Sequence, residues 1–116
     1  VVTTQVTVTP PACPQPGTWT GTTSQSRSVS FDVTQTTACQ IEAFKITYRA
    51  DCTSGYVIKT DTFGSAPVSN NEFSIGDVDG TFNAPNQASG TLITAFFDPN
   101  IGFCSASVTW NAAPSP

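Results

Sequence analysis

The residues that could do chemistry are few in this chain and lie far apart. It has eight acidic residues, four cysteines and no histidine. Without histidine or a free cysteine, no Ser–His or Cys–His nucleophile can be built. A glycosidase needs two facing carboxylates, whereas the acids here fall mainly in expected turns or beside strand ends, where solvated surface charge is the usual role. We therefore expect no enzyme activity and no cofactor.

One acidic run has oxygen ligands of the kind that calcium prefers. Asp77 and Asp79 precede Gly80, and Asn83 or Asp98 could add to the set. A full calcium site needs about six or more oxygens, and the run lacks the spacing of an EF-hand. We expect a turn punctuated by glycine here, and no metal site.

Four aromatic side chains could form a platform on which a sugar stacks. They are Trp19, Tyr48, Tyr56 and Trp110. Three of them fall on strand faces that we expect to point inward, beside phenylalanine and valine. Core packing is therefore the better interpretation.

The four cysteines predict two disulfides in an oxidising compartment, because their number is even and the chain is small. They are Cys13, Cys39, Cys52 and Cys104. Residues 40–49 are predicted to form one extended strand of about 30 Å. A disulfide needs Cα atoms within about 7 Å, so a bridge between the two cysteines that flank this strand is disfavoured. We favour Cys13–Cys39 with Cys52–Cys104; the alternative is Cys13–Cys52 with Cys39–Cys104.

Composition excludes several classes of function. Only 10% of the 116 residues are charged and the net charge is −4, so nucleic acid, which needs a patch of Lys and Arg, is not an expected partner. Serine and threonine number 31, which makes the polar surface one of hydroxyl groups and amides. No apolar run approaches about 18 residues, so we expect no membrane insertion. A chain that starts with Val1 rather than Met is consistent with a processed, mature protein.

Alternating side chains predict about nine short strands and no helix, which indicates a single all-β domain. The predicted strands are residues 1–9, 17–21, 27–34, 40–49, 55–63, 73–75, 80–83, 91–97 and 103–110. Glycine, proline, asparagine and aspartate mark the turns between them, including a loop at 76–79. We expect an antiparallel β-sandwich, Ig-like or jelly-roll-like, with an extended N-terminal strand and two disulfides.

The last two predicted strands form a hairpin around a turn at 98–102, and the rest of the fold is organised around it. Leu92 and Phe96 share one face of the first strand, and Ile93 and Phe97 share the other. Only one face can cover the core of this domain. The other must meet a second sheet, a loop or another molecule.

The predicted core is largely aromatic. It comprises Trp19, Phe31, Phe44, Ile46, Phe73, Val108 and Trp110. Alternation along residues 40–49 puts Glu42 on the face of Phe44, at the wet end of the strand, and Lys45 on the outer face. Lys59 is also expected to face outward, opposite Tyr56 and Ile58, and this argues against an isopeptide bond from either lysine.

Several short motifs follow one another along residues 17–112. They are Trp19-x-Gly21, Val29-Ser30-Phe31-x-Val33, Phe44-x-Ile46, Cys52, Gly80-Thr81-Phe82, Ala88-Ser89-Gly90-Thr91, and Cys104 to Thr109-Trp110-Asn111-Ala112. In this pattern the chain resembles a group of secreted bacterial β-sandwich domains whose function is mostly unassigned. The resemblance implies secretion and a bridge between Cys52 and Cys104. It carries over no catalytic residue.

We divide the chain into an arm with its spacer, residues 1–16, and a β-sandwich body, residues 17–116. In the arm, Val2, Val6 and Val8 share one face of a predicted strand. Four prolines between residues 10 and 16 then make a stiff, extended spacer. The arm could pair with an edge of its own sandwich. We favour the hypothesis that it adds a strand to a neighbouring molecule, as in donor-strand complementation.

The sequence thus predicts a secreted structural subunit, extracellular or on the cell surface, that polymerises with copies of itself into a filament, pilus or surface layer. The predicted assembly residues are Val2, Val6 and Val8 of the arm and Leu92, Ile93, Phe96 and Phe97 of the recipient. The alternative is a glycan-binding module, or a β-sandwich repeat of a surface adhesin, with surface glycans as the partner.

Overall fold

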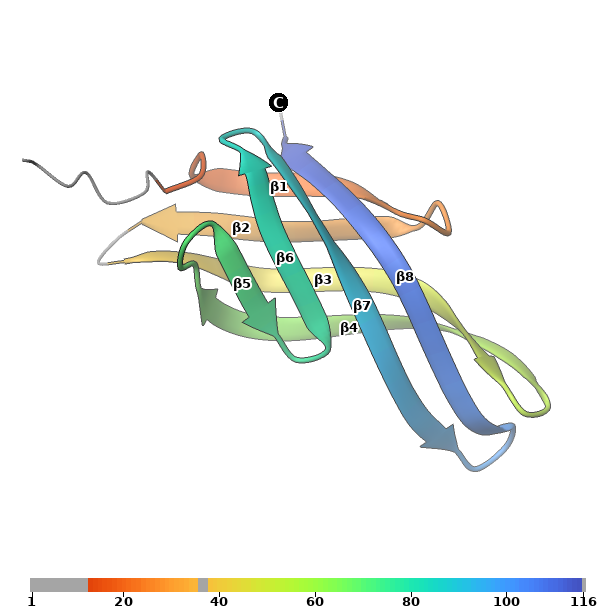
Figure 1. Ribbon diagram of the computed structural model, residues 1–116. Helices are drawn as coiled ribbons and strands as arrows, with labels where there is room; N and C mark the ends of the chain where they lie inside the picture. The colour runs from red at the N-terminus through yellow and green to blue at the C-terminus, as the bar shows by residue number, and fades with distance from the viewer. Residues whose placement is uncertain (1–12, 36–37, 116) are drawn as a thin grey trace, which may run out of the picture.

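The structure is a computed structural model that describes residues 13–35 and 38–115 (Figure 1). Its strands are β1 (Gly17–Thr23), β2 (Ser28–Gln35), β3 (Cys39–Cys52), β4 (Gly55–Pro67), β5 (Glu72–Ile75), β6 (Val78–Ala84), β7 (Gln87–Asp98) and β8 (Gly102–Pro114). Each matches a predicted strand, and the ninth predicted strand, residues 1–9, lies outside the described residues. The described ranges hold no helix that is long and apolar enough to cross a membrane.

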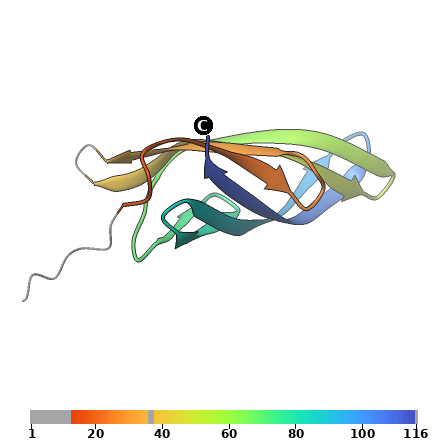
Figure 2. The same ribbon diagram turned by 90° about the horizontal axis from the view of Figure 1, so that it is seen from above.

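The strands form one antiparallel sheet in the order β4-β3-β2-β1-β8-β7-β6-β5. Figure 2 shows that this sheet doubles back on itself, so that the half containing β1 to β4 lies over the half containing β5 to β8. Two pairings join the halves: β1 pairs with the C-terminal part of β8, and Cys52 of β3 lies opposite Cys104 of β8. The prediction of an all-β antiparallel domain is confirmed, and its two layers are halves of a single continuous sheet.

Aromatic rings fill the space between the two halves. Trp19, Phe31 and Phe44 stack in a row on one half, with successive ring centroids 5.7 and 5.6 Å apart. Trp110 of β8 meets Phe31 and Phe44 edge-on, at 5.9 and 5.6 Å. The predicted core is confirmed, because all seven of its members are buried: Trp19, Phe31, Phe44, Ile46, Phe73, Val108 and Trp110.

An irregularity in β3 overturns one predicted face. The register with β2 shifts near the start of β3, where Ala43 adopts a positive φ of 52°. Such a shift marks a bulge, in which one strand carries an extra residue. Ile41 and Phe44, three residues apart, are therefore both fully buried. The prediction that Glu42 shares the face of Phe44 is wrong, because the bulge places its side chain on the opposite face.

β6 begins earlier than predicted. The loop expected at residues 76–79 is wrong: Gly76 and Asp77 form a short turn, and the strand starts at Val78. Val78 is fully buried and lies opposite Leu92 of β7. Contact with this partner, far away in the sequence, outweighs the turn-forming residues on either side of Val78.

Both favoured disulfides are present. Cys13–Cys39 and Cys52–Cys104 have Cα–Cα distances of 5.5 and 3.9 Å, and the described residues include no free cysteine. The two bridges lie at opposite ends of β3, which runs from Cys39 to Cys52. Since disulfides persist in oxidising compartments, they indicate that the chain matures in one.

The last residues of the predicted spacer are attached to the body. Cys13 is bridged to Cys39, and the N–H of Gln15 donates to the carbonyl of Pro85 in the turn between β6 and β7 (3.4 Å). The described chain thus enters the body at the Cys39 end of β3. We call this the entry end, and we call the opposite end, where Cys52 is bridged to Cys104, the hairpin end.

The close approach of β7 to the core at Gly90 gives a stability prediction. A Cβ at this position would collide with the carbonyl oxygen of Asp79 and the ring of Trp110. We expect Gly90→Ala to lower the free energy of unfolding by about 1–3 kcal/mol, as overpacking does. Denaturant unfolding measures this change.

Gly64→Ala is the matched control, because a Cβ there meets nothing within 4 Å on the exposed strand β4. Its unfolding free energy should stay the same or rise slightly, since alanine loses less chain entropy than glycine. Equal destabilisation by the two substitutions would contradict the packing at Gly90.

Candidate interaction surface

The β7–β8 hairpin extends beyond the other strands of its half of the sheet (Figure 1). β6 accompanies β7 as far as the pair Val78 and Leu92, and the next contact on this edge is the N–H of Ile93, which donates to the carbonyl of Asp77 (3.2 Å). Beyond it, no strand in the described part of the chain pairs with this edge of β7. We call residues 93–98 the free edge of β7.

Backbone groups of the free edge are arranged to accept another strand. The N–H of Ile93 faces this edge, and the direction of backbone groups in a strand repeats every two residues. The N–H and C=O groups of Ala95 and Phe97 therefore face the same way. They offer alternating donors and acceptors in the pattern that an added strand uses.

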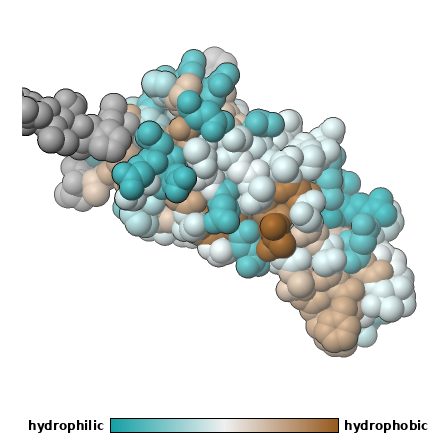
Figure 3. All heavy atoms as spheres, viewed as in Figure 1, coloured by the Kyte–Doolittle hydropathy of each residue, from teal (hydrophilic) through white to brown (hydrophobic). Residues whose placement is uncertain are grey.

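Large apolar side chains stand beside the free edge. Ile93, Phe97 and Phe103 expose 65%, 61% and 75% of their surface. Phe97 and Phe103 lie opposite each other on β7 and β8, and their rings meet edge to face with centroids 5.1 Å apart. Figure 3 shows the resulting apolar surface at the hairpin end. An exposed apolar surface of this kind is typical of an interaction site.

The predicted assembly residues differ in how far the structure buries them. Ile93 and Phe97 are exposed, Phe96 is half-buried, and Leu92 is fully buried and belongs to the core. Val2, Val6 and Val8 lie outside the described residues. Phe103 is missing from the predicted set, although the sequence contains the feature that identifies it: the hairpin turn at 98–102 places it directly across from Phe97.

The free edge of β7 differs from the two outermost edges of the described sheet. β5 has only four residues, and short edge strands resist pairing with other chains. β4 carries Lys59 and Asp61 on its inner face, and inward-pointing charges also block pairing. Residues 93–97 contain no charge and no proline, and their pairing with β8 has no bulge. The free edge of β7 therefore lacks these protections.

The two faces of β4 are the reverse of those predicted. Lys59 lies opposite the buried Tyr48, and its ammonium is 4.1 Å from the centroid of the Phe96 ring, so the prediction that it faces outward is wrong. Tyr56 and Ile58 are exposed instead. The lysine is tolerated inside because its stem packs on apolar surface and its charge rests on an aromatic face.

The hairpin end is held rigidly beneath the apolar surface. Beside the Cys52–Cys104 bridge, the N–H of Thr53 donates to the carbonyl of Phe103 and the N–H of Ser54 donates to the carbonyl of Ile101, both at 3.0 Å. These contacts fasten the tip of the β3–β4 hairpin to the tip of the β7–β8 hairpin. A surface ordered in advance loses less entropy when a partner binds.

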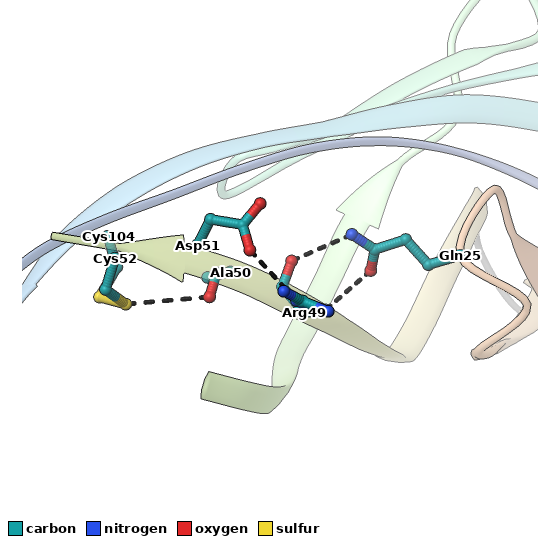
Figure 4. A network of polar contacts seen from close by, with 6 residues as sticks. All are labelled: Gln25, Arg49, Ala50, Asp51, Cys52 and Cys104. Carbon is teal, nitrogen blue, oxygen red and sulfur yellow. Dashed lines mark hydrogen bonds and ion pairs between the residues drawn. A yellow bond between two sulfur atoms is a disulfide. The ribbon is translucent and has the colours of Figure 1, made fainter. Parts of the chain in front are cut away.

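A shallow groove of about 560 Å³ lies next to this surface, between β3 and β8. Its polar walls are occupied by internal contacts (Figure 4). The Gln25 amide donates to the carbonyl of Arg49 (3.0 Å) and accepts from the N–H of the same residue (2.7 Å), and the Arg49 guanidinium pairs with Asp51 (3.1 Å). Gln25 thus takes the place of a strand partner for β3, and the amide of Gln25 and the charges of Arg49 and Asp51 are engaged in contacts within the chain.

The four aromatic side chains that could form a sugar platform do not share one surface. Trp19, Tyr48 and Trp110 are fully buried, and Tyr56 is the member that remains exposed. The guanidinium of Arg49 covers the Tyr56 ring at 4.1 Å. A sugar would have to displace this cation to stack on the ring.

The two calcium candidates do not form a joint site. The carboxylate of Asp79 accepts a hydrogen bond from the hydroxyl of Ser74 (2.6 Å) on the exposed side of β6. Asp77 lies in the turn before β6, and its charge acts on the buried Tyr48. Across the described ranges, no three His, Cys, Asp or Glu residues come close enough together to hold a metal ion.

Comparison of the chain with protein-family models, with curated proteins and with solved structures found no match to any of them. The resemblance to secreted bacterial β-sandwich domains therefore stays a prediction.

The buried phenol of Tyr48, beneath the hairpin end, predicts a pH dependence. Burial raises its pKa above the ordinary value, and the hydrogen bond to Asp61 (2.6 Å) and the charges of Asp61 and Asp77 raise the pKa further. The folded state therefore holds this proton more tightly than the unfolded state does. The stabilisation is complete below about pH 10, the pKa of an unfolded tyrosine, and is lost as the pH rises above it.

The Tyr56→Phe variant isolates this effect, because the chain has two tyrosines. In the native state its phenolate absorbance should stay low at pH 10–11 and appear on unfolding. The unfolding free energy of the Tyr48→Phe/Tyr56→Phe variant should decline less steeply above about pH 10. A phenol that titrates with the unfolded value in the native state would contradict the burial of Tyr48.

Proposed function

We propose that this chain is a secreted structural subunit that self-assembles outside the cell by strand addition. The acceptor is the free edge of β7, and the donor is the arm, residues 1–9, of another copy. In this proposal the body is a β-sandwich of the Ig-like or jelly-roll-like kind, and the assembly is a filament, pilus or surface layer.

The observation that carries the proposal is the unprotected edge of β7. Natural sheets protect exposed edges because unpaired backbone groups recruit other chains. The outermost strands here follow this rule, since β5 is short and β4 has inward charges. The free edge of β7 does the opposite: its residues 93–97 carry no charge, the large side chains of Ile93, Phe97 and Phe103 flank it, and a disulfide fastens it in place. Such an edge has the properties of a pairing site.

The sequence of the arm fits this acceptor. Main-chain hydrogen bonds to Ala95 and Phe97 would supply affinity whatever the side chains of the donor. Valines at positions 2, 6 and 8 share one strand face, and on the outer side they would cover Ile93 and Phe97. Fully burying a valine is worth about 1.5 kcal/mol or more, from which the cost of ordering the arm must be subtracted.

The composition of the chain suits an extracellular assembly. The disulfides indicate an oxidising compartment, and only 10% of the residues are charged. When subunits with few charged side chains come into contact, the free-energy cost of desolvating charged groups is small. The chain contains 31 serines and threonines, whose hydroxyl groups make strand surfaces polar without adding charge.

Ala95→Pro tests the proposed acceptor. Proline removes the N–H that faces the free edge, and edge positions tolerate it because no ladder bond within the fold is lost. The fraction of polymer at a given concentration should fall about tenfold or more, which corresponds to about 1.4 kcal/mol. Electron microscopy and light scattering measure the polymer, and circular dichroism checks the fold.

Ala95→Ser is the matched control for this substitution, because serine retains the N–H and a small side chain. It should assemble as the unaltered chain does. If Ala95→Pro folds normally and polymerises at the same concentration as Ala95→Ser, strand addition at the free edge of β7 is ruled out.

A further inference from the structure

We infer that the arm reaches only the free edge of another copy, never its own, and that the resulting contact is head-to-tail and open-ended. This inference rests on the proposed strand addition. It adds a physical reason why the arm pairs between chains and not within its own chain, and it gives the symmetry of the assembly.

The length of β3 gives the distance between the two ends of the body. It runs from Cys39 to Cys52, with a disulfide at each end. Asp51 lies opposite Ser105, and Ser105 lies opposite Ala95, so the middle of the free edge is level with Asp51. Twelve strand residues separate this level from Cys39, which corresponds to about 35 Å when the bulge is allowed for.

The donor is tethered at the far end of this length. The Cα atom of Cys13 is 5.5 Å from that of Cys39. Gln15 holds the same entry end through its bond to Pro85. Figure 1 shows the described N-terminal residues at one end of the molecule and the turn between β7 and β8 at the other. Anything N-terminal to Cys13 must therefore span the body to reach its own free edge.

The chain is too short for its valines to do so. A fully extended chain spans at most about 3.6 Å per residue. Val8 is five residues and Val6 seven residues from Cys13, which gives reaches of about 18 and about 25 Å. Both fall short of about 35 Å, and Val2, at about 40 Å, arrives only if every residue is fully stretched. These limits hold whatever precedes Val2 in the chain.

The direct path within the chain is also occupied. β6 covers the edge of β7 from Ala88 to Leu92, so an arm that starts at the entry end cannot follow this edge towards Ile93. A second copy has neither restriction, because its entry end can lie next to the free edge. Val6 and Val8 can then pair together along residues 93–98.

The arm leaves the body at the entry end and the free edge lies at the hairpin end, and this placement determines the symmetry of the assembly. A two-fold dimer uses the same surface on both partners, whereas a contact between two different surfaces repeats from copy to copy. Each added copy occupies one free edge and presents a new one. Assembly therefore grows as a polar chain, with an unused free edge at one end and an unused arm at the other.

Two full-length variants test this arrangement when mixed. Val6→Asp/Val8→Asp disables the arm and keeps the free edge, and Ala95→Pro disables the edge and keeps the arm. Each variant alone should be monomeric. An equimolar mixture should give a species with the mass of one copy of each and nothing larger, as measured by native mass spectrometry and size-exclusion chromatography with light scattering.

Each other result of the mixing experiment has a different meaning. If the unaltered chain polymerises and the mixture stays monomeric, the head-to-tail inference is wrong. Dimers of either variant alone would indicate a two-fold contact and would also overturn it. Polymers of Ala95→Pro alone would instead overturn the proposed acceptor. Ala95→Lys, which retains the N–H and adds a charge at the free edge, replaces Ala95→Pro if the proline variant fails to fold, and the same pairing with the arm variant is expected.

Discussion

The contact between aromatic rings across the doubled sheet is the interaction on which the rest of the structure depends. Strand pairing connects the two halves only where β8 meets β1 and β3 among the described strands. Between those points, Trp110 lies edge-on against Phe31 and Phe44 and holds the halves together. Ring packing of this kind adds to the free energy gained by burying apolar area. Gly90 leaves the room that the Trp110 ring needs, and Gly80 does the same for the ring of Phe73.

The free edge of β7 exists because two demands on this strand end at different residues. Burial of apolar side chains in the core requires β7 as far as Leu92, where Val78 of β6 is its partner. Pairing with β8 continues to Asp98. Between these two points, residues 93–98 of β7 pair with β8 on one side and with no described strand on the other. The Cys52–Cys104 bridge ties β8, the partner of this stretch, to β3.

Much of the fold follows from local pattern, because the period of two in strands and the geometry of disulfides act at short range. The strands and the aromatic core could be predicted in this way, whereas disulfide geometry excluded one of the three possible cysteine pairings and left two open. The errors come from long-range partners. Val78 lies in a strand because it pairs with Leu92. Lys59 faces inward, where its ammonium lies over the ring of Phe96. The bulge at Ala43 likewise depends on which residue of β2 faces which residue of β3. The omission of Phe103 is different, because the turn at 98–102 already places it across from Phe97.

The two disulfides at the ends of β3 have a mechanical consequence. A pull applied between the entry end and the β7–β8 hairpin passes from Cys13 through its bridge into β3, and from Cys52 through the second bridge into β8. The loops that these bridges close are bypassed, so they cannot be drawn out while the bridges hold. Tension runs along β3, where neighbouring strands resist by shear of many hydrogen bonds together. The body is thereby built to transmit force along its length with little extension.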